Sequence, residues 1–127
     1  RFVVYGLRQR QSDHANITIQ PPSRKGFLRD LSQAKAVIAN AGFALLSESL
    51  HLGIPMLAVP VRAQYEQIVN AEMLHRLGYG MTMPTLTADA IAAFCYRIPE
   101  YVQRLATYPH RDNTETFAVI DELIEAP

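Results

Sequence analysis

The sequence has no tryptophan, and its only cysteine is Cys95. A single cysteine cannot form a disulfide within the chain, so nothing indicates an oxidising compartment. Basic and acidic residues balance at 12 each, which argues against the basic surface of a nucleic-acid-binding domain. The longest apolar runs are far shorter than the roughly 20 residues of a membrane-spanning helix, and no signal peptide is recognisable. We expect a cytoplasmic protein without a nucleic-acid partner, with peripheral attachment at the inner membrane face left open.

The chain has room for one domain with a hydrophobic core. It has 127 residues, of which 49% are hydrophobic, and it contains no low-complexity tract. The chain begins with Arg1 and passes at once into the apolar run Phe-Val-Val-Tyr at residues 2–5. Because a natural start inside a core strand without methionine is unusual, we expect a fragment of a longer protein.

Short apolar runs alternate with helical stretches along the sequence. The runs are rich in β-branched residues, and they predict strands at residues 2–5, 17–19, 36–39, 55–59 and 80–83. Helices are predicted at residues 27–34, 43–52, 65–77, 88–97, 99–107 and 114–125. This alternation predicts an α/β fold, a Rossmann-like open parallel sheet of about five strands flanked by helices.

Several of these helices have an apolar stripe and recognisable end signals. The expected stripes are Phe43, Leu46 and Leu50; Val69, Met73 and Leu77; and Phe117, Ile120 and Ile124. Gly53 and Gly78 are positioned to end two of the helices, and Thr87 to cap a third. Residues 21–26 are polar and irregular and predict a surface loop beside a site.

The first candidate site follows the predicted strand at residues 36–39, because ligands bind at the carboxyl ends of parallel strands. It comprises Asn40, Ala41, Gly42, Phe43 and Ala44. The unpaired N–H groups of a helix start suit a diphosphate, and a glycine lets the backbone approach it closely. Glu48, on the face opposite the Leu46 and Leu50 stripe, can accept hydrogen bonds from a ribose diol. The alternative is a tight strand-to-helix turn followed by a solvated glutamate.

The second candidate site follows the strand at residues 55–59. Glu66, Gln67 and Asn70 share one face near the start of the next helix. Carboxylate and amide groups directed at one point can bracket the hydroxyls of a sugar. The alternative is an amphipathic helix whose polar face is solvated.

Other chemistry finds little support in the sequence. The four histidines have no metal-ligand spacing among themselves or with Cys95, so no metal site is predicted. Cys95 is expected to be a packed small hydrophobic residue. There is no phosphate-binding Gly-Lys-Ser/Thr loop, no Gly-x-Gly-x-x-Gly after the first strand and no nucleophile elbow. No complete catalytic set is therefore predicted.

Residues 36–71 read AVIANAGFALLSESLHLGIPMLAVPVRAQYEQIVNA. The Gly-containing loop, Glu48, the Gly-Ile-Pro at 53–55, Pro60 and the Glu-Gln-x-x-Asn-Ala helix start are all present. Together they resemble the donor-binding region of glycosyltransferases with two facing Rossmann-like domains (the GT-B fold), such as the MurG-type and UDP-glycosyltransferases. Residues 26–31, Gly-Phe-Leu-Arg-Asp-Leu, resemble the family segment whose backbone contacts the nucleobase. The similarity covers residues 26–80.

The resemblance implies a role for each candidate residue. Phe27 and Leu28 would contact the base, residues 40–44 would hold the diphosphate around Gly42, and Glu48 the ribose. Glu66 and Gln67 would contact the donor sugar, and Asn70 would support the diphosphate or the same polar cluster. The chain departs from the family pattern in having Asn40 where several relatives have His, and Leu45 where Ser is common.

For function, the resemblance implies that residues 1–127 are the C-terminal domain of a metal-independent, inverting glycosyltransferase with a nucleotide-sugar donor, in particular a UDP-sugar. It implies no cofactor. The catalytic base would come from an N-terminal acceptor domain outside the chain, so the fragment alone would be inactive. The first strand of this half, central in the usual strand order, would also be missing, and a homo-oligomer is one way to cover the gap. A UDP-N-acetylglucosamine 2-epimerase-like domain and a non-catalytic α/β interaction module are the alternative interpretations.

Overall fold

The computed structural model describes residues 1–7, 12, 14–109 and 113–125. Strands and helices alternate over most of its length, as the sequence predicts. The strands are β1 (Phe2–Tyr5), β2 (Ile17–Gln20), β3 (Val37–Ala39), β4 (Met56–Ala58) and β5 (Gly80–Thr82). The helices are α1 (Arg24–Leu31), α2 (Phe43–His51), α3 (Tyr65–Arg76), α4 (Ala88–Leu105) and α5 (Thr114–Glu125).

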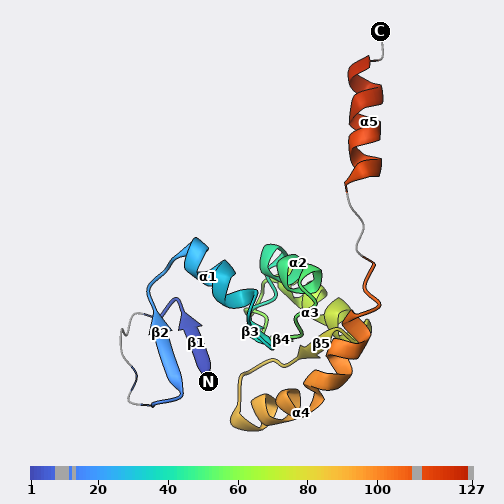
Figure 1. The fold of residues 1–127 in the computed structure, drawn as a ribbon. Helices are drawn as coiled ribbons and strands as arrows, with labels where there is room; N and C mark the ends of the chain where they lie inside the picture. Colours follow the sequence, from blue (N-terminus) through green and yellow to red (C-terminus); the bar gives the residue numbers. More distant parts are fainter. Residues whose placement is uncertain (8–11, 13, 110–112, 126–127) are drawn as a thin grey trace.

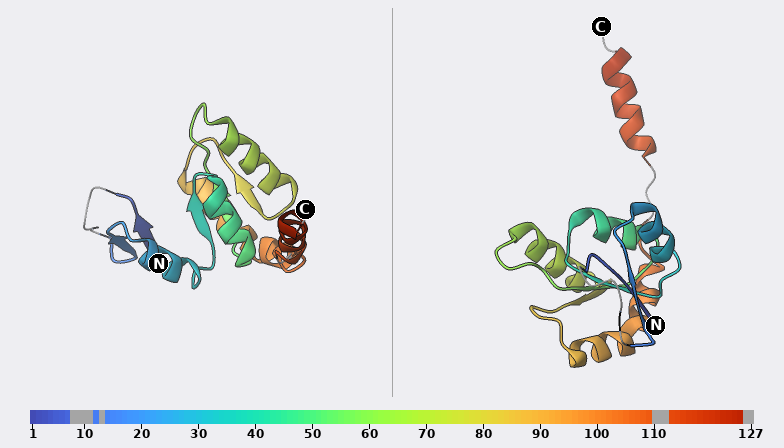
Figure 2. Two further views of the ribbon diagram at one scale, coloured as in Figure 1. Left: turned by 90° about the horizontal axis from the view of Figure 1, so that it is seen from above. Right: turned by 90° about the vertical axis from the view of Figure 1, so that its left-hand side faces the viewer.

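All of the strand pairs are parallel, which confirms the predicted α/β class with parallel strands flanked by helices. The strands are nevertheless divided between two sheets. One sheet contains β1 and β2, and the other has the order β3-β4-β5. Figures 1 and 2 show α1 joining the two parts, with the small sheet to one side of the larger.

The core lies on both faces of β4, whose three residues are almost completely buried. Met56 and Ala58 pack with residues of α2 and α3, including Leu50 and Leu74. Leu57 points to the other face, where it packs with Phe94 and Tyr101 of α4. This alternation follows from the two-residue period of a strand, and it explains why a central parallel strand is apolar throughout.

The predicted stripe of α2 is confirmed in part, and that of α3 is wrong. In α2, Leu50 is buried and Leu46 packs against the core, but Ser49 is buried as well and Phe43 is 65% exposed. In α3 the buried residues are Ala71 and Leu74, while the predicted stripe is exposed at all three positions, Val69, Met73 and Leu77. Small residues at the contact let both helices approach the sheet closely, and a search for large apolar side chains overlooks them.

The predicted break between two helices near Pro99 is wrong, because α4 runs through this residue as one helix. Phe94 and Tyr101, stacked with their ring centroids 5.9 Å apart, anchor both sides of the proline in the core. The Arg97–Glu100 ion pair also spans it. Proline inside a helix removes one backbone hydrogen bond and bends the helix, and Figure 1 shows α4 changing direction along its length.

The helix ends agree with the predicted signals, with one exception. Gly53 and Gly78 have φ of +68° and +74° beyond the ends of α2 and α3, and the Thr87 hydroxyl accepts a hydrogen bond from the Ala90 N–H. The exception is α1, predicted to begin at Phe27. It begins at Arg24 because the Ser23 side chain accepts a hydrogen bond from the Gly26 N–H and caps it. Residues 24–26 are thus helical rather than part of a loop.

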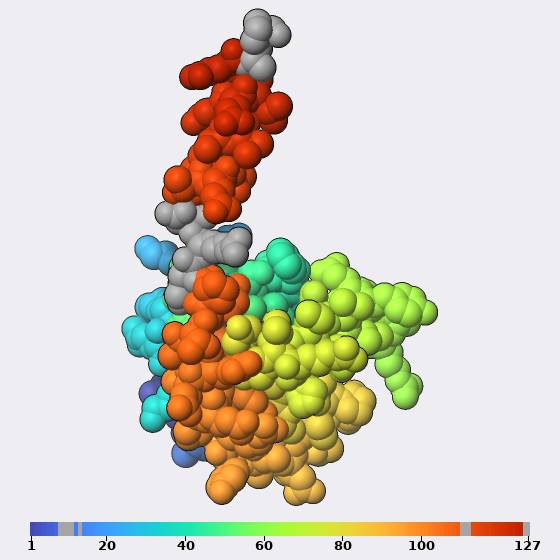
Figure 3. All heavy atoms as spheres, turned by 90° about the vertical axis from the view of Figure 1, so that its right-hand side faces the viewer, coloured from blue at the N-terminus to red at the C-terminus, as the bar shows by residue number. Residues whose placement is uncertain are grey.

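The last helix, α5, stands away from the rest of the molecule (Figures 1 and 3). Its predicted apolar residues Phe117, Ile120 and Ile124 are all exposed. Among the described residues, no helix is both long enough and apolar enough to cross a membrane.

Candidate functional site

The start of α2 is an open backbone corner. Gly42 is the N-cap, with φ of −64° and ψ of 134°, and no side chain of the cap bonds to the N–H groups of the first turn. These angles are accessible to any residue, so the backbone does not require glycine here. A Cβ on Gly42 would meet no atom within 4 Å. A side-chain carbon added at Gly42 would therefore lie in open space.

Asn70 connects this corner to α3. Its side-chain Nδ2 donates a hydrogen bond to the backbone oxygen of Ala41, with a distance of 3.0 Å between the two atoms. Ala41 itself is completely buried. Because β3 and β4 are adjacent and parallel, the loops that follow them meet at the same edge of the sheet. The two predicted candidate segments are thus brought together, with Asn70 as the link.

The loop between β4 and α3 is held by Gln67. Its side-chain Oε1 accepts a hydrogen bond from the Val61 N–H at 2.9 Å. The side-chain NH₂ group of Gln67 takes no part in this bond. Within this loop, Ala63 has φ of 62°, in the left-handed region that non-glycine residues rarely adopt. A strained backbone conformation such as that of Ala63 occurs most often at functional sites. Glu66 is exposed in the first turn of α3.

Two more of the predicted residues, Asn40 and Glu48, lie in the segments on either side of this corner. Asn40 is exposed at the end of β3, and Glu48 is half-buried on α2. Leu45, a position where the resemblance noted in the sequence leads us to expect serine, packs against the hydrophobic core. This side chain therefore contributes to the core and offers no hydroxyl near the start of α2.

A second concave surface lies where β1 and β2 meet α1. This pocket has a volume of about 340 Å³ and is lined by Tyr5, Gly6, Pro22, Ser23, Arg24 and Phe27. The rings of Tyr5 and Phe27 meet edge to face, with centroids 5.3 Å apart. Leu28, the other residue expected near a nucleobase, is half-buried on α1 and is not part of the lining.

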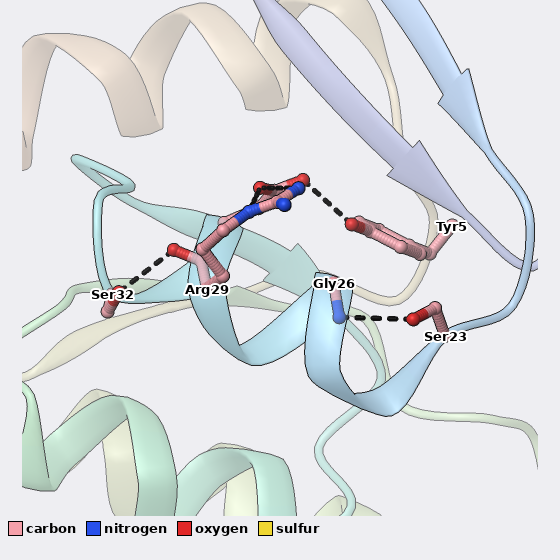
Figure 4. A network of polar contacts seen from close by, with 6 residues as sticks. Tyr5, Ser23, Gly26, Arg29 and Ser32 are labelled. Carbon is pink, nitrogen blue, oxygen red and sulfur yellow. Dashed lines mark hydrogen bonds and ion pairs between the residues drawn. The ribbon is translucent and has the colours of Figure 1, made fainter.

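A polar network fixes Tyr5 at this pocket (Figure 4). The Tyr5 hydroxyl donates to Asp30 Oδ2 at 2.7 Å, and Arg29 donates to the other carboxylate oxygen from Nε and Nη2, each at 3.0 Å. The hydrogen bond from Tyr5, followed by those from Arg29, lowers the pKa of Asp30. The same bond to Asp30, followed by burial, raises the pKa of Tyr5. Sequence reasoning did not select Tyr5, although a tyrosine at the carboxyl end of a strand is a signal that could have found it.

Two other expectations concern reactive groups. Cys95 is exposed, so the prediction that it is a packed small residue is wrong. The described part of the chain contains no group of three or more His, Cys, Asp or Glu residues able to hold a metal ion.

A larger hollow of about 530 Å³ lies between the end of α3 and α4, around Arg76, Glu100 and Arg104, and contains none of the candidate residues.

The parallel strands, flanking helices and open loops at the carboxyl edge define a Rossmann-like domain, and solved structures similar to it are GT-B glycosyltransferases. The spinosyn forosaminyltransferase SpnP superposes with a TM-score of 0.78 and 15% identity, covering 98% of this chain and 35% of SpnP. A Streptomyces sp. SF2575 glycosyltransferase, SsfS6, complexed with thymidine diphosphate, matches with a TM-score of 0.50 and 27% identity. That match covers 75% of this chain and 27% of SsfS6.

The sequence profile of glycosyl transferase family 1 matches residues 1–99, and the chain belongs to this family. An uncharacterized glycosyltransferase of Methanosarcina acetivorans is 31% identical over 91 residues, which are 72% of this chain and 22% of that protein. The chain therefore spans about a fifth of this relative and about a third of SpnP.

Proposed function

We propose that residues 1–127 are the C-terminal, nucleotide-sugar-binding domain of a glycosyltransferase, and that the donor diphosphate binds at the start of α2. The open corner at Gly42 carries this proposal. Its glycine is required neither by the backbone angles nor by a neighbouring protein atom. A ligand in close approach supplies a physical reason for it, and the unpaired N–H groups and dipole of a helix start favour an anion.

The nucleobase is assigned to the pocket between β1, β2 and α1. The edge-to-face pair of Tyr5 and Phe27 offers an apolar wall for the base. Leu28 lies outside the lining, and its backbone oxygen accepts a hydrogen bond from the Ser32 N–H, so its contact with the base is proposed from the resemblance alone. We propose UDP as the nucleotide. SsfS6 is complexed with thymidine diphosphate, so the thymine analogue is the second nucleotide to be tested.

The saccharide is assigned to the polar groups around the two loops. Glu48 is proposed to hold the ribose hydroxyls, and Glu66 and Gln67 are proposed to contact the donor sugar. Gln67 has its carbonyl oxygen committed to Val61, so its N–H groups are the ones that remain for a sugar hydroxyl. Asn70 supports the diphosphate loop through Ala41. Asn40 offers an amide where several relatives have histidine.

The proposed chemistry assigns leaving-group stabilisation to this domain. Negative charge grows on the diphosphate as the bond to the sugar breaks, and a preorganised donor aimed at such a charge contributes about 3–4 kcal/mol. The reaction is proposed to be metal-independent and inverting. Its base is assigned to an N-terminal acceptor domain outside residues 1–127, so the isolated chain is expected to be inactive. We place the reaction in the cytoplasm.

Calorimetric titration with UDP, thymidine diphosphate, GDP and ADP tests this proposal. We expect binding of a pyrimidine diphosphate, and a loss of at least about tenfold in affinity for Glu48→Ala, because a buried hydrogen bond to a charged group contributes about 1.5–3 kcal/mol. Glu72→Ala, on the exposed side of α3, is the control and should leave affinity unchanged. No nucleotide binding at millimolar concentration would instead favour an interaction module.

A further inference from the structure

The loop between β4 and α3 contains a tight turn that presents Arg62. The Gln64 N–H donates a hydrogen bond to the Val61 oxygen at 3.2 Å, which closes the turn. The third residue of the turn, Ala63, has φ of 62°, and Arg62 before it is not among the residues with positive φ. This combination is that of a type II β-turn. Arg62 occupies the second position of the turn, and its side chain is exposed.

The turn is fixed at both ends, so Arg62 has a defined position. On one side the Val61 N–H is held by the side chain of Gln67 at 2.9 Å. On the other side the Gln64 oxygen accepts a hydrogen bond from the Ile68 N–H of α3 at 3.1 Å. Figures 2 and 3 show this part of the chain standing out from the rest of the domain. The arginine is thus carried on an anchored loop at the carboxyl edge of the sheet.

The loops at this edge of the sheet contain little charge. The segments that follow β3, β4 and β5 are residues 40–42, 59–64 and 83–87, and Arg62 is the one charged residue among them. In the described part of the chain Arg62 forms no ion pair, whereas three other arginines each pair with a carboxylate. A long cationic side chain is therefore available at the edge where ligands bind in this kind of sheet.

The proposed donor site needs such a charge. A nucleoside diphosphate is an anion, and two of the side chains proposed to bind the donor, Glu48 and Glu66, are carboxylates. The Gly42 corner brings backbone N–H groups without a side-chain cap, and the dipole of a helix start is equivalent to only about half an elementary charge. The guanidinium of an arginine supplies a full positive charge, and its planar fork matches two oxygens of one phosphate.

The position of Arg62 in the chain places it on the sugar side of the diphosphate. Because β3 and β4 are adjacent and parallel, the loops that follow them lie at the same edge as the Gly42 corner. Asn70 of α3 is bonded to that corner. The turn that carries Arg62 comes directly before Glu66 and Gln67, which are proposed to contact the sugar. The phosphate nearest to the turn is then the one that carries the sugar.

We propose that Arg62 binds the donor phosphate to which the sugar is attached, and that its guanidinium pairs with the same phosphate in the product UDP. The proposal rests on the proposed donor site at the start of α2. Arg24 is the rival cation, because it lines the pocket assigned to the base. That pocket borders the sheet of β1 and β2, whereas Arg62 shares its edge with the Gly42 corner, which favours Arg62.

Calorimetric titration of the longer protein that contains residues 1–127, with UDP and with UMP, tests the proposal. We expect Arg62→Gln to weaken UDP binding by at least about tenfold, because a hydrogen-bonded ion pair is lost. UMP lacks the second phosphate, so its affinity should not change. Arg62→Lys keeps the charge but not the fork, and it should recover part of the UDP affinity. Lys35→Gln is the control. It removes a positive charge at an exposed position before β3, at the opposite edge of the sheet, and should leave both affinities unchanged.

The remaining outcomes overturn the proposal in distinguishable ways. Equal UDP affinity of Arg62→Gln and the unchanged protein would remove the role of Arg62 and leave the donor site standing. Equal losses for UDP and UMP would indicate a disturbed loop rather than a lost contact with the second phosphate. A loss of UDP affinity for Arg24→Gln in place of Arg62→Gln would assign the charge to the base pocket. Absence of UDP binding by the unchanged protein would overturn both this inference and the proposed function.

Discussion

The Asn70 side chain of α3 donates a hydrogen bond to the backbone oxygen of Ala41, the residue that precedes the N-cap of α2. This contact joins two segments 29 positions apart in the sequence, and it holds the loop after β3 against the helix that follows β4. The loop keeps its own N–H groups free of a side-chain cap. Asn70 therefore positions the proposed anion site without occupying it.

Replacing Asn70 by leucine should reduce both stability and nucleotide affinity. The Ala41 oxygen is in a completely buried residue, and leaving a buried acceptor unsatisfied costs about 1–3 kcal/mol. Urea denaturation measures the stability, and calorimetry with UDP measures the affinity. Glu72→Leu, on the same helix but in an exposed ion pair, is the control and should change stability by less than about 0.5 kcal/mol. Equal behaviour of the two variants would remove the positioning role.

Replacing Ala63 by glycine should stabilise the protein by about 0.5–1 kcal/mol. Ala63 has φ of 62°, and the left-handed conformation costs a residue with a Cβ about 1–2 kcal/mol, part of which is offset by the greater freedom of glycine in the unfolded chain. Thermal and urea denaturation measure the gain. Ala92→Gly, at an exposed position within α4, should instead destabilise by about 1 kcal/mol. A loss of stability for Ala63→Gly would contradict the strained conformation of this loop.

Replacing Gly80 by alanine should be strongly destabilising. Gly80 begins β5 beside Met56, and a Cβ there would overlap the Met56 backbone oxygen and press on the Leu74 side chain. Overpacking in a core typically costs about 1–3 kcal/mol, and backbone atoms of a central strand have little room to move. We expect at least about 3 kcal/mol, measured by urea denaturation or by loss of soluble protein. A near-neutral effect would mean that β5 is not held against β4 as described.

The pair formed by Tyr5 and Asp30 predicts a dependence of stability on pH. The lowered pKa of Asp30 gives a stabilisation that is complete above its ordinary value of 3.8 and is lost as the pH falls through the lower value of the folded state. The raised pKa of Tyr5 gives a stabilisation that is complete below 10.0 and is lost as the pH rises through the higher folded value. Tyr5→Phe should weaken both changes in denaturation curves measured from pH 2 to 11. Unchanged curves would show that the pair does not form in solution.

The sequence predicts the elements of this fold better than their packing. The strands follow from apolar runs between Gly and Pro, and Gly53, Gly78 and Thr87 mark helix ends as expected. The stripe of α2 was predicted in part, because Leu46 and Leu50 do pack in the core. The buried Ser49 of α2 and Ala71 of α3 were missed because they are small. Periodicity of large apolar side chains cannot reveal a contact that depends on close approach.

For the candidate site too, the sequence predicts which segments come together better than it predicts their local conformation. That residues 40–44 and Asn70 come together follows from parallel neighbouring strands, and the Asn70–Ala41 hydrogen bond shows it. The separation of β1 and β2 from the other strands could not be read from local pattern, because pairing depends on which strands are available as neighbours. The left-handed Ala63 also gives no local signal, since alanine rarely adopts that conformation. The individual roles in donor binding stay predictions.

Nucleotide affinity and thermal stability of Gly42→Val, measured on the same sample, test the central claim most directly. A Cβ at Gly42 meets no atom within 4 Å and the backbone angles there suit any residue, so stability should change by no more than about 1 kcal/mol. As a control, Ala92→Val, which adds two methyl groups on the exposed side of α4, should leave UDP affinity unchanged. The account predicts that Gly42→Val alone weakens UDP binding by at least about tenfold, because its side chain takes the space assigned to the diphosphate. Undiminished affinity in a well-folded Gly42→Val variant would contradict it.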